Sequence, residues 1–319
     1  MANVPAPVYE SFEATTFRGD TMDVIEKANS IINSYRKQGY VLSLRQLYYQ
    51  FVSRDWLANN ERNYKRLGDI VTNGRLNGLI SWTGIEDRGR DLDRWLIEED
   101  VDKILRDLPK RYAQDMWARQ EYYVEVWVEK DALSNVVERA CNPRRVPFLA
   151  CKGYLSASEA WRAGKRMQAA RDRGQTPYVI HLGDHDPSGI DMTRDNIRRL
   201  EMLSDGEVTV ERIALNRDQI DRYRPPPNPT KLTDSRADDY INEHGYECWE
   251  LDALDPSVVV DLVQRAIEPL VDESIWEEDL STERNQKAVL RGVSENWTEI
   301  EEMIRAANGE GGDDEDDTE

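Results

Sequence analysis

The sequence predicts an α/β domain preceded by a small helical domain. Two observations favour this class. Near the N-terminus apolar residues recur at helical spacing, and from Tyr122 onward short apolar runs alternate with helical patterns. Alternating strands and helices are typical of a mainly parallel, Rossmann-like sheet with helices on both faces. The chain has 319 residues, of which 39% are hydrophobic, enough for two packed domains.

Residues 1–94 are predicted to form the helical domain. Thr21 and Ser43 are expected N-caps, because each precedes a run of helically spaced apolar residues. Residues 79–85 are two short apolar pieces beside a glycine and predict a small β-wing. Three helices and a wing are typical of the winged-helix module, a common DNA-binding fold. The expected helices are 22–35, 44–54 and one that begins at residue 60.

Residues 95–120 are predicted to be a helical linker, and residues 121–215 to be the sheet domain. The expected strands are 123–128, 146–150, 178–182 and 208–215. The helices expected between them are 131–140, 156–173 and 190–203.

The remaining residues are predicted to form a helical extension, 216–308, and a disordered acidic tail, 309–319. The proline run at 224–229 excludes a helix or an inner strand there, so it is expected to cross the surface. Helices are expected at 258–266 and 283–293. The tail consists mainly of Gly, Asp and Glu, a composition that does not support a packed core.

The distribution of charge qualifies the net charge of −20, which alone argues against a nucleic-acid partner. Residues 271–319 carry 17 acids and 4 bases. Residues 36–75 are locally +5, and residues 144–173 are locally +6. Screening makes local charge matter more than the total, so these basic islands can hold a phosphate backbone. Ordinary solvated helix faces explain the islands equally well.

Cysteine spacing and hydropathy exclude several other classes. Cys141, Cys151 and Cys248 show no zinc-ligand spacing and are expected to be buried free thiols. No apolar run approaches the roughly 20 residues that a membrane span needs, and Met1 is not followed by a signal-peptide pattern. A cytoplasmic protein without a membrane partner is therefore expected.

Acidic residues follow two of the predicted strands. Glu129 ends the first strand, and Asp184 and Asp186 end the third. The carboxyl ends of parallel strands share one sheet edge, and alternate residues of an extended chain point the same way, so the three side chains can converge. Carboxylates in such proximity favour a hard divalent cation, and Mg²⁺ suits an all-oxygen site. An Asp-x-Asp pair alone is more often a helix cap.

The wider motif resembles the Toprim domain of topoisomerase VI A subunits and the meiotic double-strand-break transesterases. Glu129-Lys130-Asp131-Ala132 follows a hydrophobic strand, and Gly183-Asp184-His185-Asp186-Pro187-Ser188-Gly189 comes later, with Lys152-Gly153-Tyr154 between them. The resemblance implies that Glu129, Asp184 and Asp186 bind the metal and that Asp191 is an outer-shell residue. Lys130 is expected to position phosphate or carboxylate, or else to be a plain surface lysine.

Two adjacent tyrosines compete as the nucleophile. At 100° per residue Tyr48 falls in the apolar arc of its helix, whereas Tyr49 lies just outside it with Arg45 four residues earlier. Tyr49 is therefore expected to project toward DNA beside a guanidinium that lowers its pKa or holds a phosphate. A surface tyrosine stacked on arginine is the alternative. Arg-x-x-Tyr-Tyr resembles the catalytic-tyrosine motif of the same family, in which the second tyrosine matches the nucleophile; Gln46 departs from the acid of many relatives.

The resemblance covers roughly residues 20–215 and implies Mg²⁺-dependent cleavage of double-stranded DNA, with Tyr49 joined to the 5′ end. Cutting both strands needs two tyrosines and hence a homodimer, in which each tyrosine is expected to act with the metal site of its partner. The chain has no ATPase motif, and a separate ATPase subunit is not required for cleavage. The alternatives are a Toprim nuclease that uses water and a non-cleaving architectural DNA-binding protein.

Overall fold

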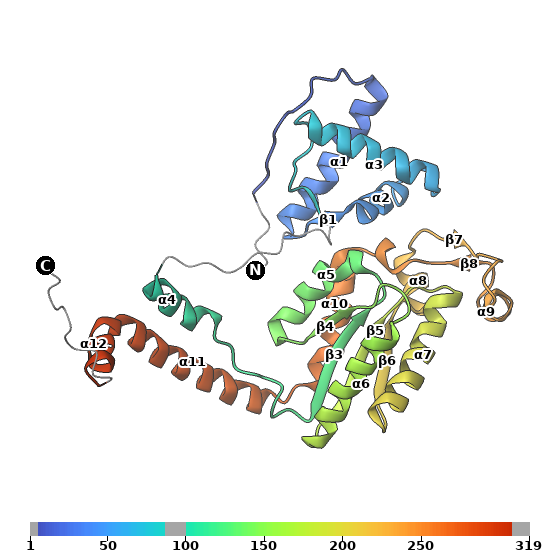
Figure 1. Ribbon diagram of the computed structural model, residues 1–319. Helices are drawn as coiled ribbons and strands as arrows, with labels where there is room; N and C mark the ends of the chain where they lie inside the picture. Colours follow the sequence, from blue (N-terminus) through green and yellow to red (C-terminus); the bar gives the residue numbers. More distant parts are fainter. Residues whose placement is uncertain (1–5, 87–99, 308–319) are drawn as a thin grey trace, which may run out of the picture. The chain divides into compact units, whose positions relative to one another are not determined.

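A computed structural model of the chain describes residues 6–86 and 100–307 (Figure 1). It is an α/β protein with one four-stranded parallel sheet and many helices. The chain divides into two compact units. The first joins Met1–Asp91 to Glu121–Val271, and the second joins Leu92–Gln120 to Asp272–Glu319. Residues 216–271 therefore belong to the same compact unit as the sheet. The predicted tail, 309–319, lies outside the described residues.

Three helices form the N-terminal part of the first unit, as predicted. Ser43 caps the second through a capping box with Gln46, which explains the glutamine at that position. Arg18, not Thr21, precedes the first helix, because that helix begins about a turn earlier than the apolar pattern. Ile25, Leu47 and Phe51 are among the residues of their shared core. The helices are α1 (Gly19–Lys37), α2 (Leu44–Val52) and α3 (Glu61–Leu76).

The predicted β-wing over 79–85 does not form as a hairpin. The N–H groups of Leu79 and Ile80 both donate to the carbonyl of Gly74, closing the end of α3, so this stretch cannot pair as a strand. A two-residue strand, β1 (Leu42–Ser43), instead pairs in parallel with β2 (Ile85–Glu86). The described residues thus contain a three-helix domain with a minimal strand pair.

The sheet has the order β4-β3-β5-β6 with every neighbouring pair parallel. All four strands were predicted, with ends shifted by up to two residues. Val128 lies opposite both Ala150 and Leu182, so the chain leaves these strands at one edge. The strands are β3 (Tyr122–Val128), β4 (Phe148–Ala150), β5 (Thr176–Leu182) and β6 (Thr209–Ala214).

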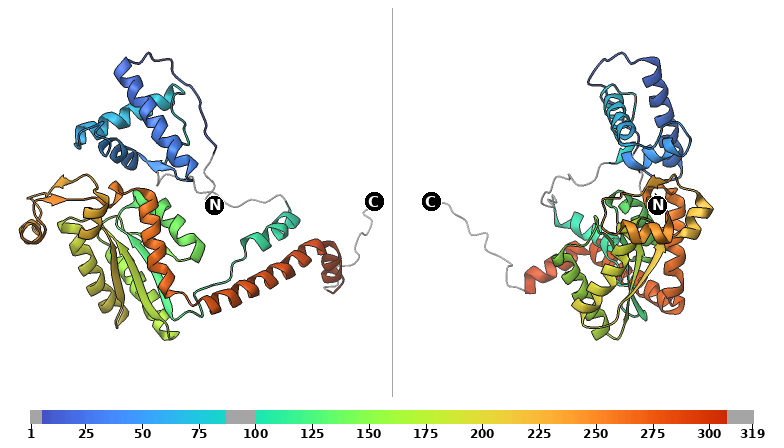
Figure 2. Two further views of the ribbon diagram at one scale, coloured as in Figure 1. Left: turned by 180° about the vertical axis from the view of Figure 1, so that it is seen from behind. Right: turned by 90° about the vertical axis from the view of Figure 1, so that its right-hand side faces the viewer.

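Helices cover both faces of this sheet (Figure 2). On one face α6 packs against α7. The contact at Gly164 of α6 is close, since a Cβ added there would lie only 2.7 Å from the Cβ of Leu203 of α7. Trp127 and Met167 belong to the core beneath them. On the other face α5 packs against α10. These helices are α5 (Ser134–Cys141), α6 (Ala157–Asp172), α7 (Pro187–Ser204) and α10 (Pro256–Ile267), and a 3₁₀ turn, η1 (Asp131–Leu133), precedes α5, while another, η2 (Asn142–Arg144), follows it.

The segment between β6 and α10 returns the chain to the sheet edge. His185 and Trp249 exchange backbone hydrogen bonds of 2.8 and 3.0 Å, which fixes this return. The predicted helical extension is therefore only partly helical in this stretch. Its elements are α8 (Arg217–Tyr223), β7 (Asn228–Pro229), α9 (Ala237–His244), β8 (Glu247–Cys248) and the 3₁₀ turn η3 (Leu251–Ala253), with β7 and β8 antiparallel. A further 3₁₀ turn, η4 (Glu268–Leu270), follows α10.

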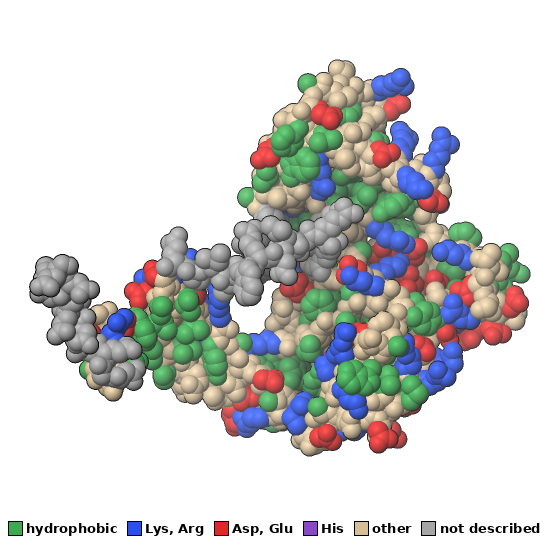
Figure 3. All heavy atoms as spheres, in the orientation of Figure 1, with side chains coloured by type: hydrophobic (Ala, Val, Ile, Leu, Met, Phe, Trp, Pro, Cys, Tyr) green, Lys and Arg blue, Asp and Glu red, His purple; other side chains and the backbone are tan. Residues whose placement is uncertain are grey.

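The second unit consists of α4 (Val101–Arg111), α11 (Glu273–Glu295) and α12 (Trp297–Ala307). Within this unit, Arg119 forms ion pairs with Glu278 and Asp279 of α11, at 2.8 and 3.0 Å. Hydrophobic side chains gather over α4 and α11 on the face drawn in Figure 3. None of the described helices is long and apolar enough to cross a membrane.

Candidate active site

Two of the three predicted metal-binding acids contact each other at the sheet edge. Glu129 follows β3 directly, and its Oε2 accepts the backbone N–H of Asp184 at 2.8 Å. Asp184 follows β5, and its Oδ1 accepts the N–H of Leu251 at 2.8 Å. Both carboxylates are buried, with 8% and 4% of Glu129 and Asp184 exposed. The prediction that the chain ends of β3 and β5 bring these acids together is confirmed.

Asp186 has a structural task of its own at the start of α7. Its Oδ1 accepts the N–H of Gly189 at 2.6 Å and the hydroxyl of Ser188 at 3.0 Å, so it is the N-cap of the helix. Capping was the alternative expected for such an acid, and here it coexists with a place in the candidate site. Across residues 6–86 and 100–307, no three His, Cys, Asp or Glu side chains are arranged to hold a metal ion.

Burial destabilises the ionised forms of Glu129 and Asp184. Burial, and then the negative charge of Asp184, raise the pKa of Glu129 to about 7. Burial also raises the pKa of Asp184, against the opposing effect of Lys130. Bound cationic charge at this edge would relieve both effects. Carboxylate oxygens are donors of the kind that a hard divalent cation such as Mg²⁺ prefers, but among the described residues they are not gathered into a group of three that could hold one.

Lys130 supplies cationic charge at this edge. Its Nζ lies 2.7 Å from Asp184, 2.8 Å from Glu250 and 3.2 Å from Asp252. Only 17% of the Lys130 side chain is exposed, so it is not a plain surface lysine. Burial alone would lower the pKa of Lys130, but Asp252 and Asp184 raise it and keep the ammonium charged. The expectation that Lys130 positions carboxylates is confirmed.

Glu250 and Asp252 are site residues that the sequence reasoning missed. Arg45 of α2 forms ion pairs with both: its Nε lies 2.8 Å from Oδ2 of Asp252, and its guanidinium also contacts Glu250. These two acids therefore link Arg45 to Lys130. The one sequence signal was Glu-x-Asp at period two, which says nothing about the partners of these acids.

We expect Asp252→Asn to lower the free energy of unfolding by about 2–4 kcal/mol. Asp252 is 1% exposed and contacts both Arg45 and Lys130, so its loss leaves partly buried cations with Glu250 as their remaining shared anion. Urea denaturation measures the change. Asp261→Asn breaks an exposed helical pair with Arg265 and is the matched control, with a change below about 1 kcal/mol. Equal losses in the two variants would contradict the assigned role of the network.

Tyr49 is not on an exposed flank, contrary to prediction: it is 4% exposed. Asn228 and Glu250 of the returning segment line the same cavity as Tyr49. Arg45 lies beside the ring, with its Cζ 5.9 Å from the centroid. Burial, and then the charge of Asp252, raise the pKa of Tyr49, and Arg45 and Asn228 only partly oppose this. Arg45 therefore does lower the pKa of Tyr49, as expected of it, but burial and Asp252 outweigh this effect.

Tyr48 lies in the core, as its helical phase predicts. Its hydroxyl accepts the N–H of Asn60 at 2.7 Å and lies 3.0 Å from the Asn60 carbonyl oxygen. Tyr48→Phe is expected to lower the free energy of unfolding by about 1–3 kcal/mol, because the Asn60 N–H loses its acceptor. Thermal and urea unfolding measure this against Tyr246→Phe, which removes the same atom from a ring that is 72% exposed. Equal unfolding midpoints for the two variants would show that the Tyr48 hydroxyl does not stabilise the segment around Asn60.

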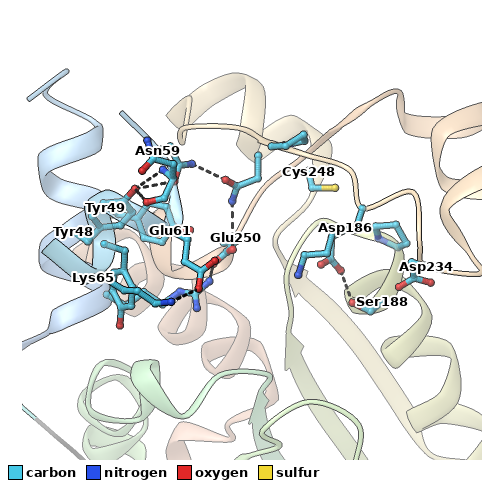
Figure 4. A pocket seen from close by; sticks show the side chains of 17 residues that line it. Tyr48, Tyr49, Asn59, Glu61, Lys65, Asp186, Ser188, Asp234, Cys248 and Glu250 are labelled. Carbon is cyan, nitrogen blue, oxygen red and sulfur yellow. Dashed lines mark hydrogen bonds and ion pairs between the residues drawn. The ribbon is translucent and has the colours of Figure 1, made fainter. Parts of the chain in front are cut away.

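A cavity of about 840 Å³ joins these elements within the first unit (Figure 4). Tyr48 and Tyr49 of α2 line it together with Asp186 at the start of α7. Its other lining groups include amides, lysines and a carboxylate from α3 and the returning segment: Asn59, Asn60, Lys65, Asn228, Lys231 and Glu250. Such a volume falls in the usual range for ligand sites.

The remaining candidates lie elsewhere. Asp191, expected in the outer shell of a metal site, instead accepts the hydroxyl of Tyr154 at 2.6 Å and pairs with Arg194 and Arg236. This cluster ties the Lys-Gly-Tyr loop to α7. All three cysteines are free thiols; Cys141 and Cys248 are buried, as predicted, whereas Cys151 is only partly buried.

The two basic islands contain both exposed and structural cations. On α3, Arg62, Lys65 and Arg66 are exposed around a shallow hollow. On α6, Arg166 instead binds Glu125, which is 3% exposed, at 2.7 Å and has a structural role. Lys65, which also lines the cavity, pairs with Glu61 at 2.8 Å, and Asp69 borders the same hollow, so acids partly balance the exposed cations of α3.

Comparison with known proteins identifies no relative. No protein-family model, no curated protein and no solved structure matches the chain.

Proposed function

We propose that this chain is a Mg²⁺-dependent, DNA-cleaving transesterase of the topoisomerase VI A-subunit kind. One observation carries the proposal: Tyr49 and Asp186, selected as nucleophile and metal ligand from separate parts of the sequence, line one cavity. Their separation by more than a hundred residues makes this juxtaposition a property of the fold. The exposed cations of α3 beside the cavity suit the backbone of DNA.

In the proposed reaction the Tyr49 oxygen forms a bond to phosphorus while the bond from phosphorus to the 3′ oxygen breaks. The phenol proton leaves to solvent and the 3′ oxygen gains a proton, so the products are a 5′-phosphotyrosyl ester and a 3′ hydroxyl. Glu129, Asp184 and Asp186 would hold Mg²⁺, which supplies stabilisation for negative charge on the phosphate and the leaving oxygen. Because the adduct conserves the phosphodiester energy, attack by the 3′ hydroxyl can reverse the step.

Arg45 is the residue that we expect to bind a phosphate oxygen beside Tyr49. In the structure its guanidinium is held by Glu250 and Asp252. A DNA phosphate would compete with these carboxylates for the same donors, since both groups are bidentate acceptors for arginine. Binding DNA would thus bring cationic charge onto the reacting group next to the phenol. The raised pKa of Tyr49 makes this help necessary, because the phenol is protonated in the absence of substrate.

A hydrolytic nuclease is the second candidate, and the burial of Tyr49 favours it. A tyrosine that is 4% exposed with a raised pKa can be structural, and a metal-activated water could then attack the phosphate. The two reactions leave different products. Hydrolysis releases free DNA ends, whereas transesterification leaves protein bonded to the 5′ end.

Supercoiled plasmid incubated with the protein and Mg²⁺ tests the proposal. Samples are denatured and divided, and protease is added to one half before electrophoresis. Breaks that enter the gel only after protease, with protein-linked label on the 5′ end, support transesterification. Breaks that need no protease favour the nuclease. Salt-sensitive binding with no breaks under any metal condition would leave an architectural DNA-binding protein.

A further inference from the structure

We infer that the ammonium of Lys130 takes the place of a metal ion at the sheet edge, and that a divalent cation binds Asp184 by displacing it. Lys130 is in this role a positioning residue for the acids. The inference rests on the metal-binding part of the proposed function, but it involves neither Tyr49 nor DNA. It makes the affinity of this edge for a divalent cation depend on one lysine.

Three carboxylates surround the Lys130 ammonium. Its Nζ lies 2.7 Å from Oδ2 of Asp184, 2.8 Å from Glu250 and 3.2 Å from Asp252. A lysine ammonium has three N–H donors and no acceptor, so three acids match its donors. Asp184 follows β5, whereas Glu250 and Asp252 precede α10, and Lys130 itself follows β3. One cation therefore holds three separate segments of the chain together.

The acids at this edge gather around the ammonium and not around a shared metal position. Within 6–86 and 100–307, no three acidic, histidine or cysteine side chains are placed to hold a metal ion. Both oxygens of Asp184 have partners: Oδ1 accepts the N–H of Leu251 at 2.8 Å, and Oδ2 faces Lys130. A divalent cation on Oδ2 would lie close to the ammonium, where burial strengthens the repulsion between them. Binding of the ion to Asp184 therefore requires Lys130 to withdraw.

Burial explains why a cation has to stay with these acids. Asp184 and Asp252 are 4% and 1% exposed, and a buried carboxylate without a partner is strongly unfavourable. Arg45 also pairs with Glu250 and Asp252. Of these two cations, Lys130 is the one within ion-pair distance of Asp184. Loss of the Lys130 charge is therefore the change that leaves Asp184 open to another cation.

The balance of charge favours exchange for a divalent ion. Two cations, Arg45 and Lys130, meet four acids, which leaves two negative charges when all four are ionised: Glu129, Asp184, Glu250 and Asp252. Burial, and then the charge of Asp184, raise the pKa of Glu129 to about 7. A divalent ion in place of the ammonium adds one positive charge. The four-carbon stem of lysine is flexible, so the ammonium can withdraw while the backbone stays in place.

Lys130→Gln tests the inference through metal binding alone. The new side chain is neutral but keeps N–H donors for the neighbouring carboxylates. Binding of Mn²⁺ to the full chain, measured by isothermal titration calorimetry, is expected to be at least about 10-fold tighter in this variant than in the unmodified protein. Lys287→Gln is the matched control, because Lys287 is also largely covered, with 25% of its side chain exposed, and lies 2.7 Å from the buried Glu283. Its affinity should equal that of the unmodified protein.

Displacement can also be measured in the unmodified protein, which decides the inference if Lys130→Gln does not fold. Acetylation followed by mass spectrometry reports which lysines the reagent can reach. Only 17% of the Lys130 side chain is exposed, so it should react slowly, and saturating Mg²⁺ should increase its acetylation several-fold. Lys65, whose side chain is 71% exposed, should react equally with and without the ion.

The outcomes distinguish the inference from the proposed function. Tighter Mn²⁺ binding by Lys130→Gln, with Lys130 acetylation that rises with Mg²⁺, supports the inference even if the unmodified protein never cleaves DNA. Equal Mn²⁺ affinity in the two proteins, or unchanged acetylation of Lys130 at saturating Mg²⁺, would overturn the inference and leave metal-dependent cleavage intact. Absence of Mn²⁺ binding in both proteins would overturn the inference together with the metal site of the proposed function.

Discussion

Tyr49→Phe is expected to eliminate the covalent protein–DNA adduct and to reduce strand cleavage by at least about 1000-fold. The change removes one hydroxyl, which is the atom that must bond to phosphorus. The ring keeps its place beside Arg45, whose Cζ lies 5.9 Å from the centroid. Because the ring supplies most of the packing, the free energy of unfolding should change by about 1 kcal/mol or less. Adduct is measured by transfer of 5′-labelled DNA to protein after denaturation.

Tyr48→Phe is the comparison that gives this result its meaning. It removes the same atom one residue earlier, from a core position, and should retain at least partial cleavage despite its cost in stability. Metal-dependent cleavage by Tyr49→Phe at the unmodified rate would identify water as the nucleophile. Inactive Tyr48→Phe with active Tyr49→Phe would mean that the two tyrosines have been assigned the wrong way round.

Elements with strong local periodicity could be predicted from the sequence. The four strands are short apolar runs bounded by turn residues, and the sheet places Glu129 and Asp184 at one edge simply because parallel strands end together. The Ser43 cap could also be predicted, since a capping box depends on residues three apart. The core position of Tyr48 could be predicted from helical periodicity, because α2 presents its apolar arc inward.

Features that depend on contacts between distant segments could not be predicted from the sequence. Helical phase places Tyr49 just outside the apolar arc, but phase cannot reveal that Asn228 of a distant segment lines the same cavity. Glu250 and Asp252 pair with Arg45 across more than two hundred residues, and no local pattern encodes that pairing. The hairpin expected over residues 79–85 fails for a local reason instead, since the carbonyl of Gly74 accepts the N–H groups of Leu79 and Ile80 that a hairpin would use.

Glu129→Gln and Asp186→Asn are each expected to reduce cleavage by at least about 100-fold while DNA binding stays within about 3-fold. Each replacement keeps a hydrogen-bond acceptor, because the new amide oxygen can still accept the N–H of Asp184 in the first variant and cap α7 in the second. What is lost is one negative charge of the donor set. Excess EDTA should stop cleavage by the unmodified protein to the same extent. Full activity in both variants, or of the unmodified protein in EDTA, would contradict the assignment of the metal site.

Mg²⁺ should raise the unfolding temperature of the unmodified protein more at pH 8 than at pH 5, which tests the same site without DNA. Burial and Asp184 raise the pKa of Glu129 to about 7, above its ordinary value near 4.5. The folded state therefore binds more protons than the unfolded state between these values, and its stability falls as the pH rises through this interval. Bound Mg²⁺ offsets that loss only where Glu129 is ionised. Scanning calorimetry of the unmodified protein and Glu129→Gln measures the effect, and an equal Mg²⁺ shift at both pH values, or in both proteins, would exclude Glu129 as a ligand.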